Sequence, residues 1–87
     1  KMKDKKKIQD FIKNLLQAKK NLPKDVIKNL EKFDYLDYGQ IDSLELITFI
    51  SKIEKKFKFK FTSKELSSRK FRNVLGLIEI ILKRKKL

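Results

Sequence analysis

Apolar residues recur at helical spacing in three stretches of this 87-residue chain, and this periodicity limits the possible folds more than any other feature. Positions i, i+3, i+4 and i+7 share one face of an α-helix, so each stretch predicts an amphipathic helix with one buried side. The predicted helices span about 6–20, 42–56 and 74–84. Their apolar stripes are Ile8, Phe11, Ile12, Leu15 and Leu16; then Leu46, Ile50, Ile53 and Phe57, widened by Ile47 and Phe49; then Val74, Leu77, Ile78, Ile81 and Leu82.

Capping residues indicate where two helices begin. Asp42 and Thr62 each precede a glutamate by three positions, which is the spacing of a capping box at a helix N-terminus. The glutamates are Glu45 and Glu65. The first box begins the second long helix, and the second box predicts a short helix over 63–68.

The segments between the long helices carry weaker signals. A proline ends the first helix, and residues 24–32 predict a further short helix. Residues 33–41 have no helical period and predict a long loop. Residues 56–62 alternate lysine and phenylalanine, but no second alternating run exists to pair with them. We therefore expect an extended connector whose Phe59 and Phe61 fill part of the core.

The last helix adds two expectations. Asn73 precedes it as a plausible N-cap, and Gly76 lies inside it, where glycine costs about 1 kcal/mol relative to alanine and so indicates close packing. Together these patterns predict a single all-α domain over residues 1–87. Residues 1–5 precede the first apolar stripe and are expected to form a flexible N-terminal extension.

Composition excludes several function classes. The chain has no cysteine and no histidine, which removes disulfides, thiolate metal sites and the commonest general base. A domain of this size has little room for a deep catalytic cleft, so we expect no enzyme activity. No signal peptide is recognisable, and no stretch approaches the roughly 20 apolar residues that cross a bilayer. We expect a cytoplasmic protein without a membrane span.

The charge is strongly basic but unevenly distributed. The formal net charge is +13, and lysines outnumber the three arginines Arg69, Arg72 and Arg84 by a wide margin. Residues 33–51 contain no basic residue at all, although they include four acidic ones. These are Asp34, Asp37, Asp42 and Glu45. This acidic island in a basic chain is where a functional site is expected.

Ser43 is the candidate for chemistry within this island. It occupies the first turn of the second helix directly after the loop, where its hydroxyl should be exposed and where an anionic phosphate ester would be favoured. The nearest basic residue in sequence is Lys52, so no general base accompanies the serine as a nucleophile would require. The residue is either an ordinary first-turn serine or one that another enzyme modifies.

The run from Gly39 to Leu46, GQIDSLEL, resembles the attachment motif of acyl carrier proteins. The resemblance extends over about residues 8–85, including the helix pattern and the long first loop. It implies a four-helix acyl-carrier-like bundle with a long loop between the first and second helices and a short third helix. It also implies that Ser43 takes a 4'-phosphopantetheine arm from coenzyme A and holds an acyl or aminoacyl group as a thioester.

The same resemblance implies partners and recognition residues. The partners would be a phosphopantetheinyl transferase, an acyl- or aminoacyl-activating ligase, and acyltransferase or synthase enzymes, with the carrier as a monomer. Asp42 and Leu44 flank the attachment serine. The residues expected to contact partners are Asp37, Glu45, Ile47 and Glu54.

Two details refine this resemblance. Two residues separate Gly39 from Asp42, a spacing similar to that of stand-alone carriers such as the D-alanyl carrier proteins, and the stretch 69–73 is loosely similar to them as well. Carriers of this family are usually acidic, whereas Lys52, Lys55 and Lys56 interrupt the distal part of the expected surface. This departure favours dedicated partners over those of housekeeping fatty-acid synthesis.

Two alternatives remain open at this level. A small basic helical protein that binds nucleic acid would need its lysines on one face beside exposed aromatic rings, and the run around Phe59 and Phe61 is the best candidate. The acidic island would oppose such binding. A helix lying on anionic lipid is compatible with the first apolar stripe, but a helical core requires the same stripe.

Overall fold

The computed structural model describes residues 2–84, with side chains described from residue 4 onward. Every regular element in this part of the chain is helical, which confirms the predicted all-α class. The elements in order are α1 (Met2–Gln17), α2 (Lys24–Lys28), η1 (Leu30–Lys32), α3 (Ser43–Phe57), α4 (Ser63–Leu66), η2 (Arg69–Arg72) and α5 (Val74–Arg84), where η denotes a 3₁₀ helix.

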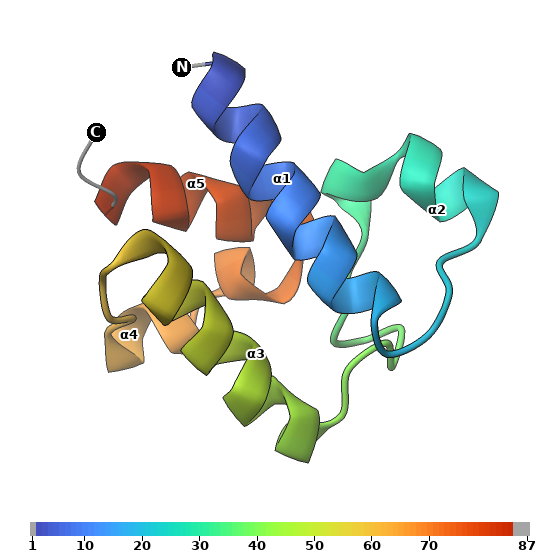
Figure 1. Cartoon of the computed structure of the whole chain (residues 1–87). Coiled ribbons are helices and arrows are strands. Elements are labelled where there is room, and N and C mark those ends of the chain that lie inside the picture. The colour runs from blue at the N-terminus through green and yellow to red at the C-terminus, as the bar shows by residue number, and fades with distance from the viewer. Residues whose placement is uncertain (1, 85–87) are drawn as a thin grey trace.

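The three long helices pack around a common core (Figure 1). The helix α5 packs against α1 and against both 3₁₀ helices. The N-terminal end of α3 lies at the opposite end of the molecule from the start of α1 and the end of α5 (Figure 1). The four helices that the resemblance implied correspond to α1, α3, α4 and α5, and α2 is an additional short helix on the side of α1.

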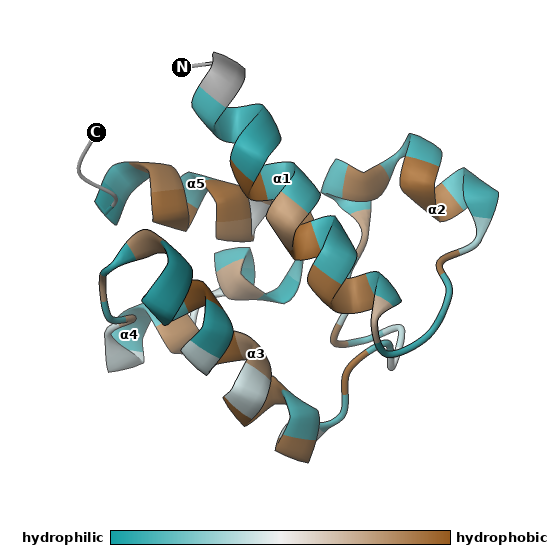
Figure 2. Cartoon of the chain, viewed as in Figure 1, coloured by the Kyte–Doolittle hydropathy of each residue, from teal (hydrophilic) through white to brown (hydrophobic). Residues whose placement is uncertain are grey.

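The core is built from the predicted apolar stripes. Figure 2 shows hydrophobic stretches along α1, α3 and α5 with hydrophilic residues between them. The most deeply buried side chains, each with less than 2% of its surface exposed, include one polar residue, Gln40, and one aromatic residue of the first loop, Tyr35. The others are Ile8, Ile12, Leu16, Ile53, Val74, Leu77, Ile78 and Ile81. Two residues of the loop before α3 thus belong to the core.

The helix α1 differs from its predicted bounds at both ends. It begins at Met2 rather than near residue 6 and ends at Gln17 rather than near residue 20. The segment predicted as a flexible extension is therefore helical from Met2 onward, and the Nζ atom of Lys5 lies 2.7 Å from a carboxylate oxygen of Glu31. A polar first turn can be helical without an apolar stripe when a neighbouring element supplies an ion-pair partner for one of its side chains.

The shorter elements follow their caps. Both predicted capping boxes are present, at the starts of α3 and α4. The predicted helix over 24–32 is interrupted at Asn29, whose ψ of 43° is not helical, so the segment forms α2 and η1 instead. The turn η2 was not predicted, because its RKFR sequence has one apolar residue and no helical period.

The connector after α3 is extended, as predicted. Lys58 ends α3 in the left-handed conformation with φ of 57°, and the chain then runs without regular structure to Thr62. Phe61 is buried and Phe59 is half-buried, with their ring centroids 4.8 Å apart. The backbone N–H of Phe61 donates to Oε2 of Glu54 at 2.9 Å, which ties the connector back to α3.

Gly76 marks the close approach that its position in a helix predicted. A Cβ atom at this residue would lie 2.0 Å from the carbonyl oxygen of Lys70. The backbone N–H of Gly76 donates to Oδ1 of Asn73 at 2.7 Å, which confirms Asn73 as the cap. The absence of a side chain at residue 76 is what lets η2 pack directly on α5.

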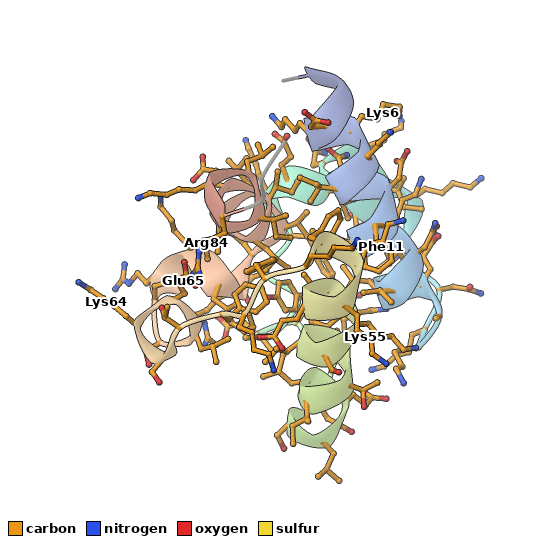
Figure 3. The ribbon with its side chains drawn as sticks, turned by 60° about the vertical axis from the view of Figure 1, so that its left-hand side comes forward. Lys6, Phe11, Lys55, Lys64, Glu65 and Arg84 are labelled. Carbon is orange, nitrogen blue, oxygen red and sulfur yellow. The ribbon has the colours of Figure 1, made fainter. Side chains whose placement is uncertain are left out.

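The far end of α5 is held by α4. An Nη atom of Arg84 donates to Oε1 of Glu65 at 2.8 Å, and the two side chains lie side by side in Figure 3. Partial burial acts to raise the pKa of Glu65, but the backbone N–H of Thr62 and the guanidinium of Arg84 outweigh it and lower that pKa. Glu65 is therefore ionised at neutral pH and serves as both cap and ion-pair partner.

Candidate functional site

Ser43 is the first residue of α3 and is exposed to solvent. Asp42 is the N-cap: its Oδ1 accepts the backbone N–H of Glu45 at 2.8 Å, and Oε1 of Glu45 accepts the N–H of Asp42 at 3.0 Å. The cap is thus satisfied without the serine. No described residue forms a hydrogen bond with the Ser43 hydroxyl, which leaves the hydroxyl accessible to a reagent from solution.

The electrostatics of this helix end favour an anion. The helix spans 15 residues, and its aligned peptide dipoles place a partial positive charge at the N-terminus. The capping box uses the backbone N–H of Glu45, so the N–H groups of Ser43 and Leu44 remain without partners within the helix. A phosphate ester on Ser43 would lie beside both of them.

Gln40 anchors the loop that precedes the serine. Its side chain has 1% of its surface exposed, and its Nε2 donates to the carbonyl oxygens of Leu16 at 2.8 Å and Lys20 at 2.6 Å. The last carbonyls of a helix have no partner within the helix. Gln40 therefore caps the C-terminal end of α1 and ties it to a position three residues before Ser43.

Gly39 makes the turn that brings Gln40 inward. Its φ of +83° lies in the left-handed region that residues with a Cβ atom rarely adopt. The N–H of Gly39 donates to the carbonyl of Leu36 at 3.1 Å, and Nζ of Lys20 donates to the carbonyl of Gly39 at 2.9 Å. The turn is thus held both from within the loop and from the segment after α1.

Tyr35 fixes the other end of the loop. Its hydroxyl donates to the carbonyl oxygen of Phe71 in η2, and its ring centroid lies 5.3 Å from that of Phe49 in α3. Burial, reinforced by the negative charge of Asp34, raises the pKa of the Tyr35 phenol well above its ordinary value. The phenol therefore stays protonated and remains a hydrogen-bond donor.

Asp37 lies in the same loop and is paired rather than free. Its carboxylate accepts a hydrogen bond from the guanidinium of Arg72, and its backbone N–H donates to Oδ1 of Asp34 at 2.8 Å. The hydrogen bond from Arg72 lowers the pKa of Asp37, and the same contact raises the pKa of Arg72. The acidic island of the sequence is therefore partly neutralised by an arginine 35 residues away.

Large apolar and aromatic side chains are exposed in the first turns of α3 and in the loop before it. Leu44 has 79% of its surface exposed, Ile47 has 67% and Tyr38 has 58%. The sequence pattern predicted that Ile47 widens the buried stripe of α3. This prediction is wrong, because the Ile47 side chain is exposed. Ile47 is one turn after Ser43 and shares its solvent-facing side, because residues four apart lie on the same face of a helix.

The predicted site residues divide into two groups. Asp42, Ser43, Leu44, Glu45 and Ile47 come together in the first two turns of α3. Glu54 lies about 16 Å further along the helix axis, eleven residues after Ser43 at about 1.5 Å per residue. Its carboxylate is half-buried and bound to the N–H of Phe61, so it stands apart from the serine.

Gln40, Lys20, Tyr35 and Arg72 also shape this site, and sequence reasoning missed all four. The sequence motif includes Gln40 but assigns no role to it. The available sequence signal for Gln40 was an uncharged amide directly after a glycine, in a loop that otherwise contains acidic side chains. The contacts of Lys20 and Arg72 join residues 19 and 35 positions apart, for which the sequence carried no local signal.

Other chemistry finds no support in the part of the chain that the structure describes. It contains no group of three acidic side chains that could hold a metal ion. It also contains no helix both long and apolar enough to cross a membrane. Cavities of about 380 and 440 Å³ lie at the distal end of α3 and between α4 and α5, and Ser43 lines neither.

These features define a class of protein. A small helical domain presents one exposed serine at a helix N-terminus, with its cap satisfied by other residues and with no base hydrogen-bonded to its hydroxyl. This arrangement fits a serine that another enzyme modifies, as in a carrier domain.

Comparison with protein families identifies the family to which this domain belongs. The family model described as the phosphopantetheine attachment site matches residues 10–81, and the chain belongs to this family. The matched region runs from α1 into α5 and includes the whole loop and α3. Domains of this family carry 4'-phosphopantetheine covalently and do not catalyse reactions themselves. Comparisons with curated proteins and with solved structures gave no match.

Proposed function

We propose that Ser43 carries the phosphopantetheine arm and that the arm holds an acyl or aminoacyl group as a thioester for delivery to partner enzymes. The observation that carries this proposal is the exposed hydroxyl of Ser43 at the start of α3, beside two unpaired backbone N–H groups. The family match supports the arm, and the motif around residues 39–46 supports this serine as its position.

The attachment reaction follows from the chemistry of the two groups. The Ser43 oxygen forms a phosphodiester with the phosphorus that bears pantetheine in coenzyme A, the pyrophosphate bond breaks, and the nucleotide leaves. The serine also loses a proton. Because no described side chain is hydrogen-bonded to the hydroxyl, the transferase must supply the base that accepts it.

The surface around the serine supports roles for its neighbours. Asp42 and Leu44 flank the arm, the half-buried Glu45 lies in the same first turn, and Ile47 is exposed one turn later, so all four are proposed contacts for partner enzymes. Asp37 and Glu54 also remain proposed partner contacts. Each of these two would have to share its carboxylate with the intramolecular donor that it already has.

The proposed partners are a phosphopantetheinyl transferase, a ligase that activates the acyl or aminoacyl group, and an acyltransferase or synthase that accepts it. The lysine-rich surface supports dedicated partners over those of general fatty-acid synthesis. The cytoplasmic location and the monomeric state expected from the sequence stay predictions.

Intact-protein mass spectrometry tests the attachment site. The chain is incubated with coenzyme A, magnesium and a transferase of broad specificity, and we expect a mass gain of one phosphopantetheine group. Ser43→Ala should abolish the gain without loss of helical content, because the Ser43 side chain makes no contact that the cap needs. Ser51→Ala is the matched control, since Ser51 is also exposed on α3. Loading of Ser43→Ala would refute the assignment.

A further inference from the structure

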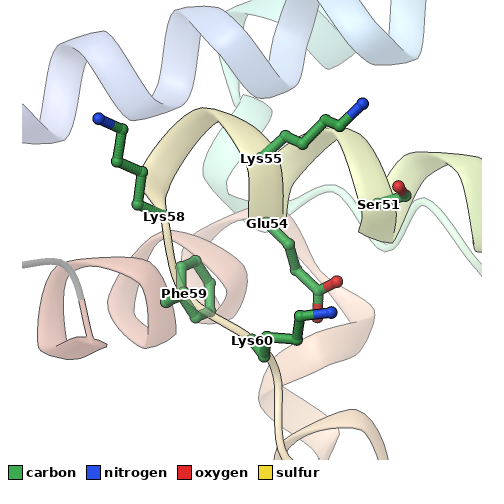
Figure 4. Close-up of a pocket in the computed structure, with 6 residues that line it drawn as sticks. All are labelled: Ser51, Glu54, Lys55, Lys58, Phe59 and Lys60. Carbon is green, nitrogen blue, oxygen red and sulfur yellow. The ribbon is translucent and has the colours of Figure 1, made fainter.

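Five lysines gather at the distal end of α3 and along the connector that follows it. They are Lys52, Lys55, Lys56, Lys58 and Lys60, and we call them the distal basic surface. All five are exposed, and none forms an ion pair with a described residue. Figure 4 shows Lys55 and Lys58 extending away from the last turns of the helix. Five unpaired cations within nine residues form a concentrated positive surface.

The one carboxylate in this stretch, that of Glu54, offsets only one of the five positive charges. Glu54 is half-buried, and its Oε2 accepts the N–H of Phe61. It contributes to one wall of an open cavity of about 380 Å³. The other residues that line the cavity are Ser51, Lys55, Lys58, Phe59 and Lys60 (Figure 4). Three lysine side chains and the half-buried ring of Phe59 therefore contribute to the lining of the cavity.

The distal basic surface begins on the solvent-facing side of α3 that also carries the exposed apolar residues next to the serine. At 100° per residue, Lys55 lies about 20° from Leu44 and about 80° from Ile47 around α3. Lys55 lies about 18 Å from Ser43 along the axis. Lys58 and Lys60 follow in the connector after the helix ends at Phe57. An enzyme that reaches the arm and lies along α3 would meet first the apolar side chains of Leu44 and Ile47 and then the lysines.

The acidic residues near the arm are largely engaged within the chain. Asp37 is paired with Arg72, and the carboxylates of Asp42 and Glu45 are used in the capping box. The capping hydrogen bonds do not remove the formal negative charges of Asp42 and Glu45 at the arm end of α3. The distal part of α3 and the connector carry five lysines against the single carboxylate of Glu54 and are net positive. The usual arrangement, in which an acidic carrier docks on a basic partner, is reversed at this distal end.

We infer that the distal basic surface is a docking surface for partner enzymes that present carboxylates, the phosphopantetheinyl transferase among them. This inference rests on the proposed function, because it requires a partner to reach Ser43. Charge complementarity across such a surface governs encounter rate and partner choice more than final affinity. The acidic groups at the arm end of α3 and the exposed Leu44 and Ile47 favour a protein over a polyphosphate.

Neutralising the surface tests the inference. The variant Lys52→Gln/Lys55→Gln/Lys60→Gln removes three charges without touching the contact of Lys56 with Phe11 or the left-handed residue 58. The control Lys19→Gln/Lys24→Gln/Lys28→Gln removes three charges from exposed positions between α1 and α2 and at α2. Circular dichroism and thermal unfolding verify that both fold. Loading is measured with the transferase from the same organism, by intact mass, as a function of carrier concentration.

We expect KM to rise about tenfold in the test variant at low ionic strength with kcat unchanged, and less than twofold in the control, in line with the size of electrostatic steering effects. The difference in KM between the wild type and the test variant should shrink as salt increases, because exposed charges are screened. Equal or improved loading of the test variant would overturn the inference while leaving Ser43 as the attachment site. No mass gain in the wild type would instead overturn the proposed function and this inference with it.

Two further probes separate the other possible ligands of a basic surface. Fluorescence anisotropy with a labelled single-stranded oligonucleotide and sedimentation with anionic lipid vesicles are performed near physiological salt. The inference expects no difference between the test variant and the control in either assay. Binding that is lost only in the test variant, together with unchanged loading, would assign the surface to nucleic acid or membrane and refute a protein partner.

Discussion

Replacing Gln40 by alanine removes the amide that joins the loop before Ser43 to the end of α1. The amide donates to two carbonyl oxygens, of Leu16 and of Lys20, from a side chain that is almost completely buried. Each neutral hydrogen bond contributes about 0.5–1.5 kcal/mol to stability. The carbonyl of Leu16 still accepts a longer hydrogen bond from the N–H of Lys19 at 3.3 Å. This remaining bond limits the loss of stability when the Gln40 amide is removed.

These contributions add up to a loss of about 2 kcal/mol in the free energy of unfolding for Gln40→Ala. For a domain of this size, that loss lowers Tm by roughly 8–16 °C. Urea denaturation followed by circular dichroism at 222 nm measures the change, and the rate of Ser43 loading well below Tm reports whether the loop has lost its position. We expect loading to slow as well, because residues 39–42 lose their anchor on α1.

Two further variants sharpen this test. Gln40→Glu keeps the shape but places a carboxylate against two carbonyl oxygens, so it should be less stable than Gln40→Ala at pH 7 and recover partly in acid, where the carboxyl group can donate once. Gln9→Ala, at a half-buried position of α1 with no side-chain hydrogen bond, should change stability by less than about 0.5 kcal/mol. A similarly small change for Gln40→Ala would refute the anchoring role.

Three other predictions concern single contacts. Gly76→Ala should destabilise the domain by more than about 1 kcal/mol in urea unfolding, because the clash with the Lys70 carbonyl outweighs the gain in helix propensity; stabilisation would contradict the close approach. Asp42→Ala should cost about 1 kcal/mol and Asp42→Asn much less, since asparagine also caps helices; equal losses in thermal unfolding would argue against the capping box. Arg72 holds the pKa of Asp37 below its ordinary value. The contribution of this ion pair to the stability of the folded state is therefore present above about pH 4 and is lost as acid protonates the carboxylate. The stability–pH curves of the wild type and Asp37→Asn should therefore differ at neutral pH and converge in acid, and parallel curves would contradict the pairing.

Much of the fold could be predicted because its signals are local. The stripes of α1, α3 and α5 repeat every three or four residues, and each capping box joins residues three apart. The same locality explains the errors. The first turn of α1 has no apolar stripe, yet Lys5 meets Glu31 across the fold. Ile47 looked like part of a stripe, but only the packing of α3 decides how wide its buried face is.

The candidate site was predictable to a similar extent. The motif identified Ser43, Asp42 and Glu45, because a cap and a first-turn serine are features of adjacent residues. The anchoring of the loop was not predictable. Gln40 contacts carbonyls 20 and 24 residues earlier, and Tyr35 contacts one 36 residues later. No local pattern records which backbone carbonyl will lie opposite a buried amide or phenol.

The sequence by itself therefore determined the helices, their caps and the serine at the start of α3, since hydrophobic periodicity and capping act within about one turn of the chain. Only the tertiary structure decided which charges remain free. Folding brings Arg72 to Asp37 and Lys20 to Gly39 and leaves the distal basic surface unpaired. Whether a charge is neutralised depends on neighbours within a few ångströms in space, and the partner of Asp37 comes from 35 positions away in the sequence.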